Sequence, residues 1–259
     1  MGHIRLGRLP KTRSWPHVFE ALTGDSISPQ QLAGSIAVAA QNQFSAFEHD
    51  DAINYCFWAL VRIVTGARGK DFAGELQQLK VSERHITSGL AFVQQVGQAI
   101  ERELLRRGHR TVFAPMAALS LREVLSATII EESRSLFGTG LREVQAACRA
   151  ISTQKRFGEL AKEFFAKFIS RSIRHLTDKE LSNHVAPEAA LASPGHVLEF
   201  QKALDRYCLE SAKIVEEFAA GWFSKHNWET NNDIPEDAAA GFTSYALNKI
   251  QMELREMHR

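Results

Sequence analysis

The sequence predicts an all-α protein: an irregular multi-helix bundle with two or three long helices and an extended N-terminal arm. Capping residues stand before several stretches whose apolar residues have helical spacing, a combination that marks helix starts. Segments that alternate apolar and polar residues, as strands do, are missing apart from residues 3–9. From about 194 to 224 the apolar side keeps a seven-residue repeat, typical of a helix packed along one seam. Its positions are Val197, Phe200, Leu204, Tyr207, Ser211, Ile214, Phe218 and Gly221.

The helix boundaries follow from caps and breaks. Ser28-Pro29 and Ser193-Pro194 each place a capping hydroxyl before a proline at the first helical position. Residues 177–180 have the form of a capping box, and breaks are expected at glycines and at Asn231-Asn232. The predicted helices cover residues 29–42, 44–65, 71–79, 83–107, 115–137, 140–175, 178–184, 194–225 and 235–257.

We expect one helical domain over residues 18–259, preceded by an arm over residues 1–17. The connections are short except for residues 183–193, an alanine-rich segment with Pro187 that we interpret as a mobile loop. Helices on both sides of this loop are too apolar to stand alone, so a second domain is not predicted.

Composition is that of an ordinary globular protein, with 44% hydrophobic residues and a formal charge of +1. The overall charge therefore predicts no partner, but its distribution is uneven. Residues 1–17 carry four bases and no acid, whereas residues 199–237 carry nine acids against four bases. Such opposed segments attract each other within a chain or between copies, although only over about one Debye length, roughly 8 Å.

Cysteine usage and the N-terminus favour a reducing, cytoplasmic setting. Cys56, Cys148 and Cys208 lie far apart among apolar residues, which is typical of buried thiols. The N-terminus lacks the apolar core of a signal peptide. The longest uncharged stretch, residues 26–47, contains a proline and several amides, so no membrane partner is predicted.

Known catalytic and nucleotide-binding motifs are missing from the sequence. It has no phosphate-binding loop, no dinucleotide fingerprint, no nucleophile elbow and no His-Glu-x-x-His motif. No histidine follows a glutamate by three residues, which excludes the ligand pairs of di-iron bundles. We therefore predict no catalytic residue, no cofactor and no enzyme.

One dipeptide is similar to a metal-site motif. His49-Asp50, with His17 before it and later aspartates, resembles the His-Asp pair of helical HD phosphohydrolases. That resemblance implies a divalent metal held by histidines and aspartates, and a metal-dependent hydrolase. In that family the pair follows an apolar helix, whereas the residues before His49 are mixed. The alternative, which we favour, is a solvated acidic helix turn with no metal.

Two basic clusters are candidates for binding nucleic acid. Arg156, Lys167, Arg171 and Arg174 project within a narrow arc of the helix predicted over 140–175, and this stripe suits phosphates or an acidic protein face. The alternative is a solvated face opposite the core. The second cluster contains Arg106, Arg107 and Arg110. Bases at a helix end also suit its negative terminus.

The N-terminal arm mixes bases with large apolar residues and two prolines, so it is not expected to be a helix. A disordered tail rarely holds so many apolar residues. The arm therefore either packs back on the helical body or docks on a partner as an extended segment. Its candidate binding residues are Ile4, Arg5, Leu6, Arg8, Leu9, Arg13 and Trp15.

Three aromatic residues lie within residues 222–228, at the end of the helix with the seven-residue repeat. Such a cluster either closes the core or forms a partner pocket. Lys225, His226 and Trp228 are the members expected to be exposed if the cluster binds a partner.

These features favour a non-enzymatic helical subunit of a larger cytoplasmic protein assembly, with another protein subunit as its partner. A bacterial multi-component defence system is one setting that suits such a subunit. The alternatives are a nucleic-acid-binding helical protein and, behind it, an HD-like hydrolase. The sequence leaves the partner's identity and the oligomeric state open.

Overall fold

The all-α prediction is confirmed for the part of the chain that the computed structural model describes. Those residues contain ten α-helices and one short 3-10 helix, and no strand occurs among them. The predicted arm, residues 1–17, and most of the predicted loop 183–193 lie outside the described residues. The structure describes residues 18, 27–40, 44, 47–132, 140–183, 191 and 193–256, the side chains of Ile130 and residues 178–183 excepted.

The helices follow one another with short connections. In chain order they are α2 (Pro29–Ala40), α3 (Asp51–Gly66), α4 (Phe72–Gln78), η2 (Glu83–His85), α5 (Gly89–Arg106), α6 (Ala114–Glu132), α7 (Leu141–Ala150), α8 (Gln154–Asn183), α9 (Pro194–Ser211), α10 (Lys213–Glu229) and α11 (Glu236–Glu256).

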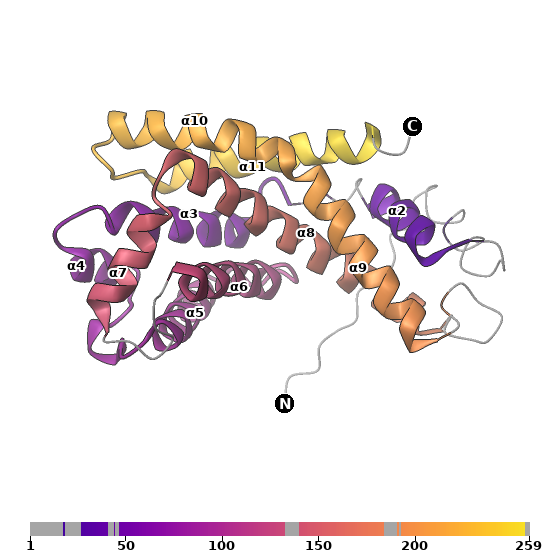
Figure 1. Cartoon of the computed structure of the whole chain (residues 1–259), viewed down its shortest axis with the longest axis horizontal. Helices are drawn as coiled ribbons and strands as arrows, with labels where there is room; N and C mark the ends of the chain where they lie inside the picture. Colours follow the sequence, from indigo (N-terminus) through magenta and orange to yellow (C-terminus); the bar gives the residue numbers. More distant parts are fainter. Residues whose placement is uncertain are drawn as a thin grey trace.

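Helix α3 is the centre of the bundle. All its residues except Asp51 and Trp58 are buried, as expected for a helix that is apolar on every side. In Figure 1, α10 and α11 lie along one edge of the molecule and α5 and α6 along the other, while α8 crosses obliquely between them. α9 leads into α10 at an angle and packs against α2.

Aromatic rings from four helices meet around Phe57 of α3. Its ring centroid lies 5.0 Å from that of Phe242 on α11, 5.1 Å from that of Phe165 and 5.7 Å from that of Phe164, both on α8. Trp222 of α10 lies 6.3 Å away. All of these rings but that of Trp222 are buried. The cluster therefore ties α10 and α11, at one edge of the bundle, to α3 and α8.

Helices α8 and α10 approach each other closely at Gly158. A Cβ atom at this position would lie 2.8 Å from the backbone oxygen of Glu216, nearer than carbon and oxygen can approach without displacement. The chain needs glycine here because backbone meets backbone.

The helix predicted over 194–225 is two helices. α9 ends at Ser211 and α10 begins at Lys213, with Ala212 between them at φ −82° and ψ −6°. The Ser211 hydroxyl donates a hydrogen bond to the carbonyl of Cys208 (3.0 Å), a local bond of the kind that bends helices.

Beyond this break the predicted seven-residue seam holds only in part, since Ile214 and Phe218 are half-buried and pack against the core. Phe200 and Leu204 are buried as expected. In α10 the buried positions are instead Val215, Ala219, Phe223 and Asn227, and Gly221 is exposed. A strict seven-residue repeat drifts by about 20° per heptad around a straight helix, so several heptads cannot keep facing one core.

Other boundaries also differ from the prediction. The region 140–175 is divided between α7 and α8 by a turn at residues 151–153. No new helix begins at 178, because Thr177 is buried inside α8 and its hydroxyl donates to the carbonyl of Ile173 (2.9 Å) rather than capping. The helix predicted over 83–107 becomes η2 and α5. The breaks at Gly108 and Asn231-Asn232 are confirmed, since all three residues have positive φ.

Candidate partner-binding sites

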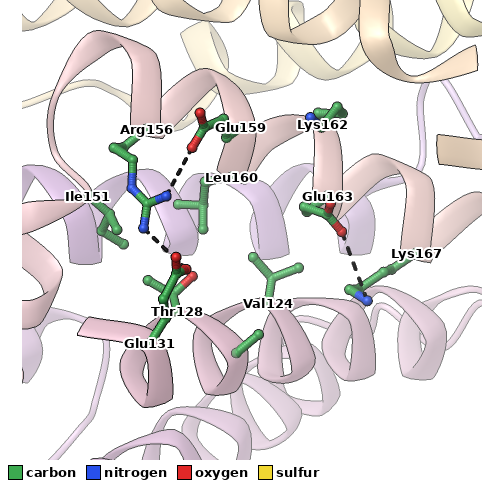
Figure 2. A pocket seen from close by; sticks show the side chains of 11 residues that line it. Val124, Thr128, Glu131, Ile151, Arg156, Glu159, Leu160, Lys162, Glu163 and Lys167 are labelled. Carbon is green, nitrogen blue, oxygen red and sulfur yellow. Dashed lines mark hydrogen bonds and ion pairs between the residues drawn. The ribbon is translucent and has the colours of Figure 1, made fainter. Parts of the chain in front are cut away.

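A groove made of two neighbouring hollows runs along α8, the first against α6 and the second between α6 and α9. It has two hollows, of about 440 and 210 Å³, which share Glu163 and Lys167 in their linings. Figure 2 shows the larger one, with side chains of α8 on one side and of α6 on the other. Apolar residues line its floor: Val124, Ile151 and Leu160. The charged residues along both hollows are Arg156, Lys162, Lys167, Arg171, Arg174, Glu123, Glu131, Glu159, Glu163 and Asp205.

The predicted basic stripe faces this groove. Arg156, Lys167, Arg171 and Arg174 all line one or both hollows, and their side chains are only 27 to 32% exposed. They therefore do not form an outer, solvated face of α8. Each of them contacts carboxylates from the described part of the chain.

Among the four bases of the stripe, Arg156 contacts the most carboxylates. Its guanidinium donates to Glu159 of α8 (3.1 Å) and to Glu131 of α6 (3.2 Å), and also to Glu132 of α6. Partial burial disfavours the charged guanidinium, but the hydrogen bonds to these glutamates outweigh that effect and raise the pKa of Arg156 above its usual value. Figure 2 shows the bonds to Glu159 and Glu131 closing one end of the hollow.

The other three bases have partners on α6 and α9. Lys167 donates to Glu123 (2.7 Å), which also accepts from Arg171. Arg174 is paired with Asp205 of α9 at 2.7 Å. Partial burial works against the charged form of Glu123, yet the hydrogen bonds from Lys167 and Arg171 hold its pKa below the usual range. Through these ion pairs the stripe links α8 to α6 and α9.

The sequence reasoning missed the acidic half of this groove. Glu123, Glu131 and Asp205 lie on α6 and α9, and only the packing of these helices against α8 brings them to the stripe. No spacing in the sequence indicates that packing, so a single helix projection could not have found them.

Two members of the second basic cluster are also paired. Arg106 and Arg107 both donate to the carboxylate of Glu103, at 2.6 to 2.9 Å, and Glu103 is only 6% exposed. Arg107 also donates to Glu236 of α11 (2.6 Å) and lies over the Tyr55 ring, 4.2 Å from its centroid. This cluster attaches α5 to α3 and α11, which gives Arg107 a structural role.

Replacing Glu103 should change how stability depends on pH. Hydrogen bonds from Arg106, and then from Arg107, outweigh the effect of burial and lower the pKa of Glu103 to about 2. Because this pKa lies below the unfolded value of about 4.3, the carboxylate stabilises the fold above that value, and the contribution is lost as pH falls toward 2. We expect Glu103→Gln to lower the free energy of unfolding by about 1 to 3 kcal/mol at neutral pH.

Urea unfolding at neutral pH and at about pH 3 measures this effect, since the difference between wild type and Glu103→Gln should shrink in acid. The exposed Glu101, 3.6 Å from Arg122, provides the matched control Glu101→Gln. An equal loss at both pH values would contradict the assignment.

Asp50 of the His49-Asp50 pair is a helix cap. It lies before α3, and its carboxylate accepts hydrogen bonds from the backbone N–H groups of Ala52 (2.9 Å) and Ile53 (3.2 Å). The helix predicted over 44–65 therefore begins only at residue 51. Asp50 is buried and His49 is exposed, so the two side chains of the motif do not share one environment.

A shallow hollow beside this cap brings two loops together. The Nδ1 atom of His109 lies 3.8 Å from the carboxylate of Asp51, and the exposed Arg110 lies next to these two residues. Among the described residues, no group of three or more histidine, cysteine or carboxylate side chains is placed to hold a metal ion. His17, the third member of the resemblance, lies outside that part of the chain.

The aromatic cluster of α10 has a buried side and an exposed side. Phe223 stacks on Phe157 of α8, 3.8 Å between centroids, and Trp222 packs 4.6 Å from Phe242. His226 is half-buried and its Nδ1 lies 2.9 Å from the carbonyl of Trp222, so it is not an exposed contact residue.

Trp228 and Lys225 are exposed. Trp228 is 86% exposed, the largest exposed fraction of any large hydrophobic residue in the described part of the chain. Lys225 lies one turn before it, 3.8 Å from Glu229. The cluster therefore both closes the core and leaves a tryptophan at the surface.

Comparisons with protein-family models, curated proteins and solved structures found no match for this chain. Within the described residues, none of the helices combines the length and apolar character needed to cross a bilayer.

Proposed function

We propose that this chain is a non-enzymatic helical subunit that binds a protein partner through the exposed end of α10. The observation that carries this proposal is Trp228, 86% exposed on a helix whose opposite side is packed into the core. Tryptophan is among the residues that contribute most to binding energy at interfaces, because it buries a large rigid surface. Its indole N–H can also donate a hydrogen bond at the edge of an interface.

The surroundings of Trp228 favour a preformed contact surface. Phe223 and Asn227, on the inward side of the same helix, are buried, and the Asn227 side chain donates to the carbonyl of Phe223 (2.7 Å). The turn that follows is attached to the turn after α3, because Arg68 donates to Asn232 (3.2 Å). A partner would therefore meet a tryptophan on a fixed stretch of backbone, with little backbone entropy to lose.

Nucleic-acid binding is the second candidate, and the pairing of the stripe does not favour it. A phosphate would have to displace Glu123, Glu131 or Asp205 from its base, and the displaced carboxylate would stay nearby and repel the phosphate. An HD-like hydrolase is not proposed, because His49 and Asp50 do not meet a third ligand among the described residues.

A cross-linking experiment tests the proposed surface. The tagged chain carries a photoreactive amino acid at position 228 and is irradiated in cells of its own source. We expect a discrete cross-linked partner from position 228 and none from position 245, where Tyr245 on α11 is also exposed. Trp228→Ala should remove the co-purifying partner while leaving the melting temperature almost unchanged, since exposed substitutions rarely alter stability by more than about 0.5 kcal/mol. Equal cross-linking at both positions would reject the surface.

A further inference from the structure

The outward face of α10 combines apolar and charged residues that the fold leaves largely uncovered. Successive residues of an α-helix are about 100° apart, so one set of residues projects within an arc of about 80°, opposite the buried positions of the helix. The set consists of Ile214, Glu217, Gly221, Lys225 and Trp228. Ile214 is half-buried and the others are exposed. Because α10 runs along an edge of the molecule (Figure 1), a second helix can reach this face.

Gly221 is the middle residue of α10, and the fold of one chain does not require a glycine there. A Cβ atom at this position would meet no side chain and no other helix of the described part of the chain within 4 Å, in contrast to Gly158. Glycine is among the least favourable residues in a helix interior, because it loses the most backbone freedom on folding. Bare backbone at the centre of an exposed face does, however, allow a second helix to approach closely.

The residues of this face are arranged symmetrically about Gly221. Ile214 and Trp228 stand seven residues before and after it, and Glu217 and Lys225 stand four residues before and after it. When two copies of a helix pair antiparallel about a two-fold axis at one residue, each side chain lies level with the one equally far on the other side of that residue. Pairing about Gly221 therefore matches apolar with apolar and acid with base, and each contact occurs twice.

The two charged residues are available for such contacts. Glu217 makes no ion pair with any residue that the structure describes. Within the same part of the chain, Lys225 has one ion pair, with Glu229 at 3.8 Å, and its side chain is 68% exposed. A parallel pairing would instead place each charge beside its own copy, which is repulsive. The charges therefore favour the antiparallel arrangement.

We infer that α10 pairs antiparallel with α10 of a second copy of this chain, in a two-fold dimer centred on Gly221. The inference rests on the proposed function, that the surface around Trp228 binds a protein, and it names that protein. Trp228 packs against Ile214 of the second copy at both ends of the contact, where an aromatic anchor contributes most to binding. The ion pairs between Glu217 and Lys225 set the direction of the two helices.

Charge reversal tests the pairing in the full chain. Sedimentation over a range of concentrations should show a reversible dimer of the wild type. Glu217→Lys and Lys225→Glu each place like charges across the axis, so each variant alone should have a dissociation constant at least about tenfold higher. An equal mixture of the two variants should dimerise as wild type does, because each supplies the charges that the other lacks. The control Glu83→Lys, at an exposed acid on η2, should leave the dimer unchanged.

A disulfide tests the position of the axis. In Gly221→Cys the two introduced thiols face each other across the axis, and close Cβ atoms are the geometric requirement for a disulfide. We expect mild oxidation to give a covalent dimer of this variant. Leu90→Cys, at a side chain that is 70% exposed on α5, should give none. The three native thiols are buried and should not interfere.

A chain that stays monomeric up to its solubility limit would overturn the dimer, and a cross-link from position 228 to a different protein would then leave the proposed function standing. Two charge variants that dimerise no better together than alone, or a dimer that forms no disulfide at position 221, would also reject the pairing. Rescue by mixing and a disulfide at 221, without any cross-link from position 228, would retain the pairing of α10 and reject Trp228 as the residue that carries binding.

Discussion

Phe57→Ala should destabilise the protein by about 3 to 5 kcal/mol, the range measured when a large buried aromatic side chain is removed. Phe57 is fully buried in α3, and its ring contacts the rings of Phe164, Phe165 and Phe242 on two other helices. These rings cannot close the cavity without moving α8 or α11. In a chain of this size the loss corresponds to a fall in melting temperature of roughly 6 to 20 °C.

Thermal unfolding followed by circular dichroism measures this shift. The matched control is Leu90→Ala, which removes an apolar side chain that is 70% exposed and should change stability by less than about 0.5 kcal/mol. If Phe57→Ala melts within a degree or two of wild type, α3 is not the centre of the core.

Removing the acids around Arg62 should destabilise the fold by about 3 to 5 kcal/mol, because it leaves a buried charge without compensation. Arg62 of α3 is 4% exposed. Its guanidinium donates to Glu75 and to Asp233, and to the amide oxygen of Gln78 (2.8 Å). In the variant Glu75→Gln/Asp233→Asn, the Arg62 guanidinium has only neutral acceptors beside it. It stays charged, because arginine does not lose its proton in proteins.

A third substitution separates charge from packing. Replacing Arg62 by methionine in the same background removes the buried charge and keeps most of the apolar volume, so Arg62→Met/Glu75→Gln/Asp233→Asn should regain most of the lost stability. Urea unfolding of the two variants and wild type gives the comparison. A triple variant that is no more stable than the double one would show that geometry, and not the unpaired charge, causes the loss.

Capping and composition were sufficient for the fold class and for several boundaries. Ser28 and Gln31 exchange hydrogen bonds at the start of α2, and Ser193 caps α9 through the N–H group of His196 (3.2 Å). These interactions join residues three apart, so the local sequence specifies them. The capping box at Thr177 failed because that residue is buried within α8, and burial is decided by distant helices.

The candidate sites could be predicted only in part. The sequence identified the four bases of the stripe, since the arc of one helix depends on local spacing. It named Trp228 only as a residue that is exposed if the aromatic cluster binds a partner. It did not identify Glu123 and Glu131 of α6, which also line the groove. These glutamates lie beside Arg156 and Lys167 because of the way α6 packs against α8, and side-chain packing determines that arrangement.

By itself, the sequence determined that this chain is helical, where many of its helices begin, and that its cysteines belong to the core, because helix caps, periodicity and side-chain polarity act over a few residues. The tertiary structure decided that the repeat of residues 194–224 breaks at Ala212 and that the basic stripe is paired along an interhelical groove. It also decided that the Trp228 side chain is exposed at the surface. These features depend on contacts between residues far apart in the chain, and the pattern of one helix does not encode the shape and charge of its neighbours.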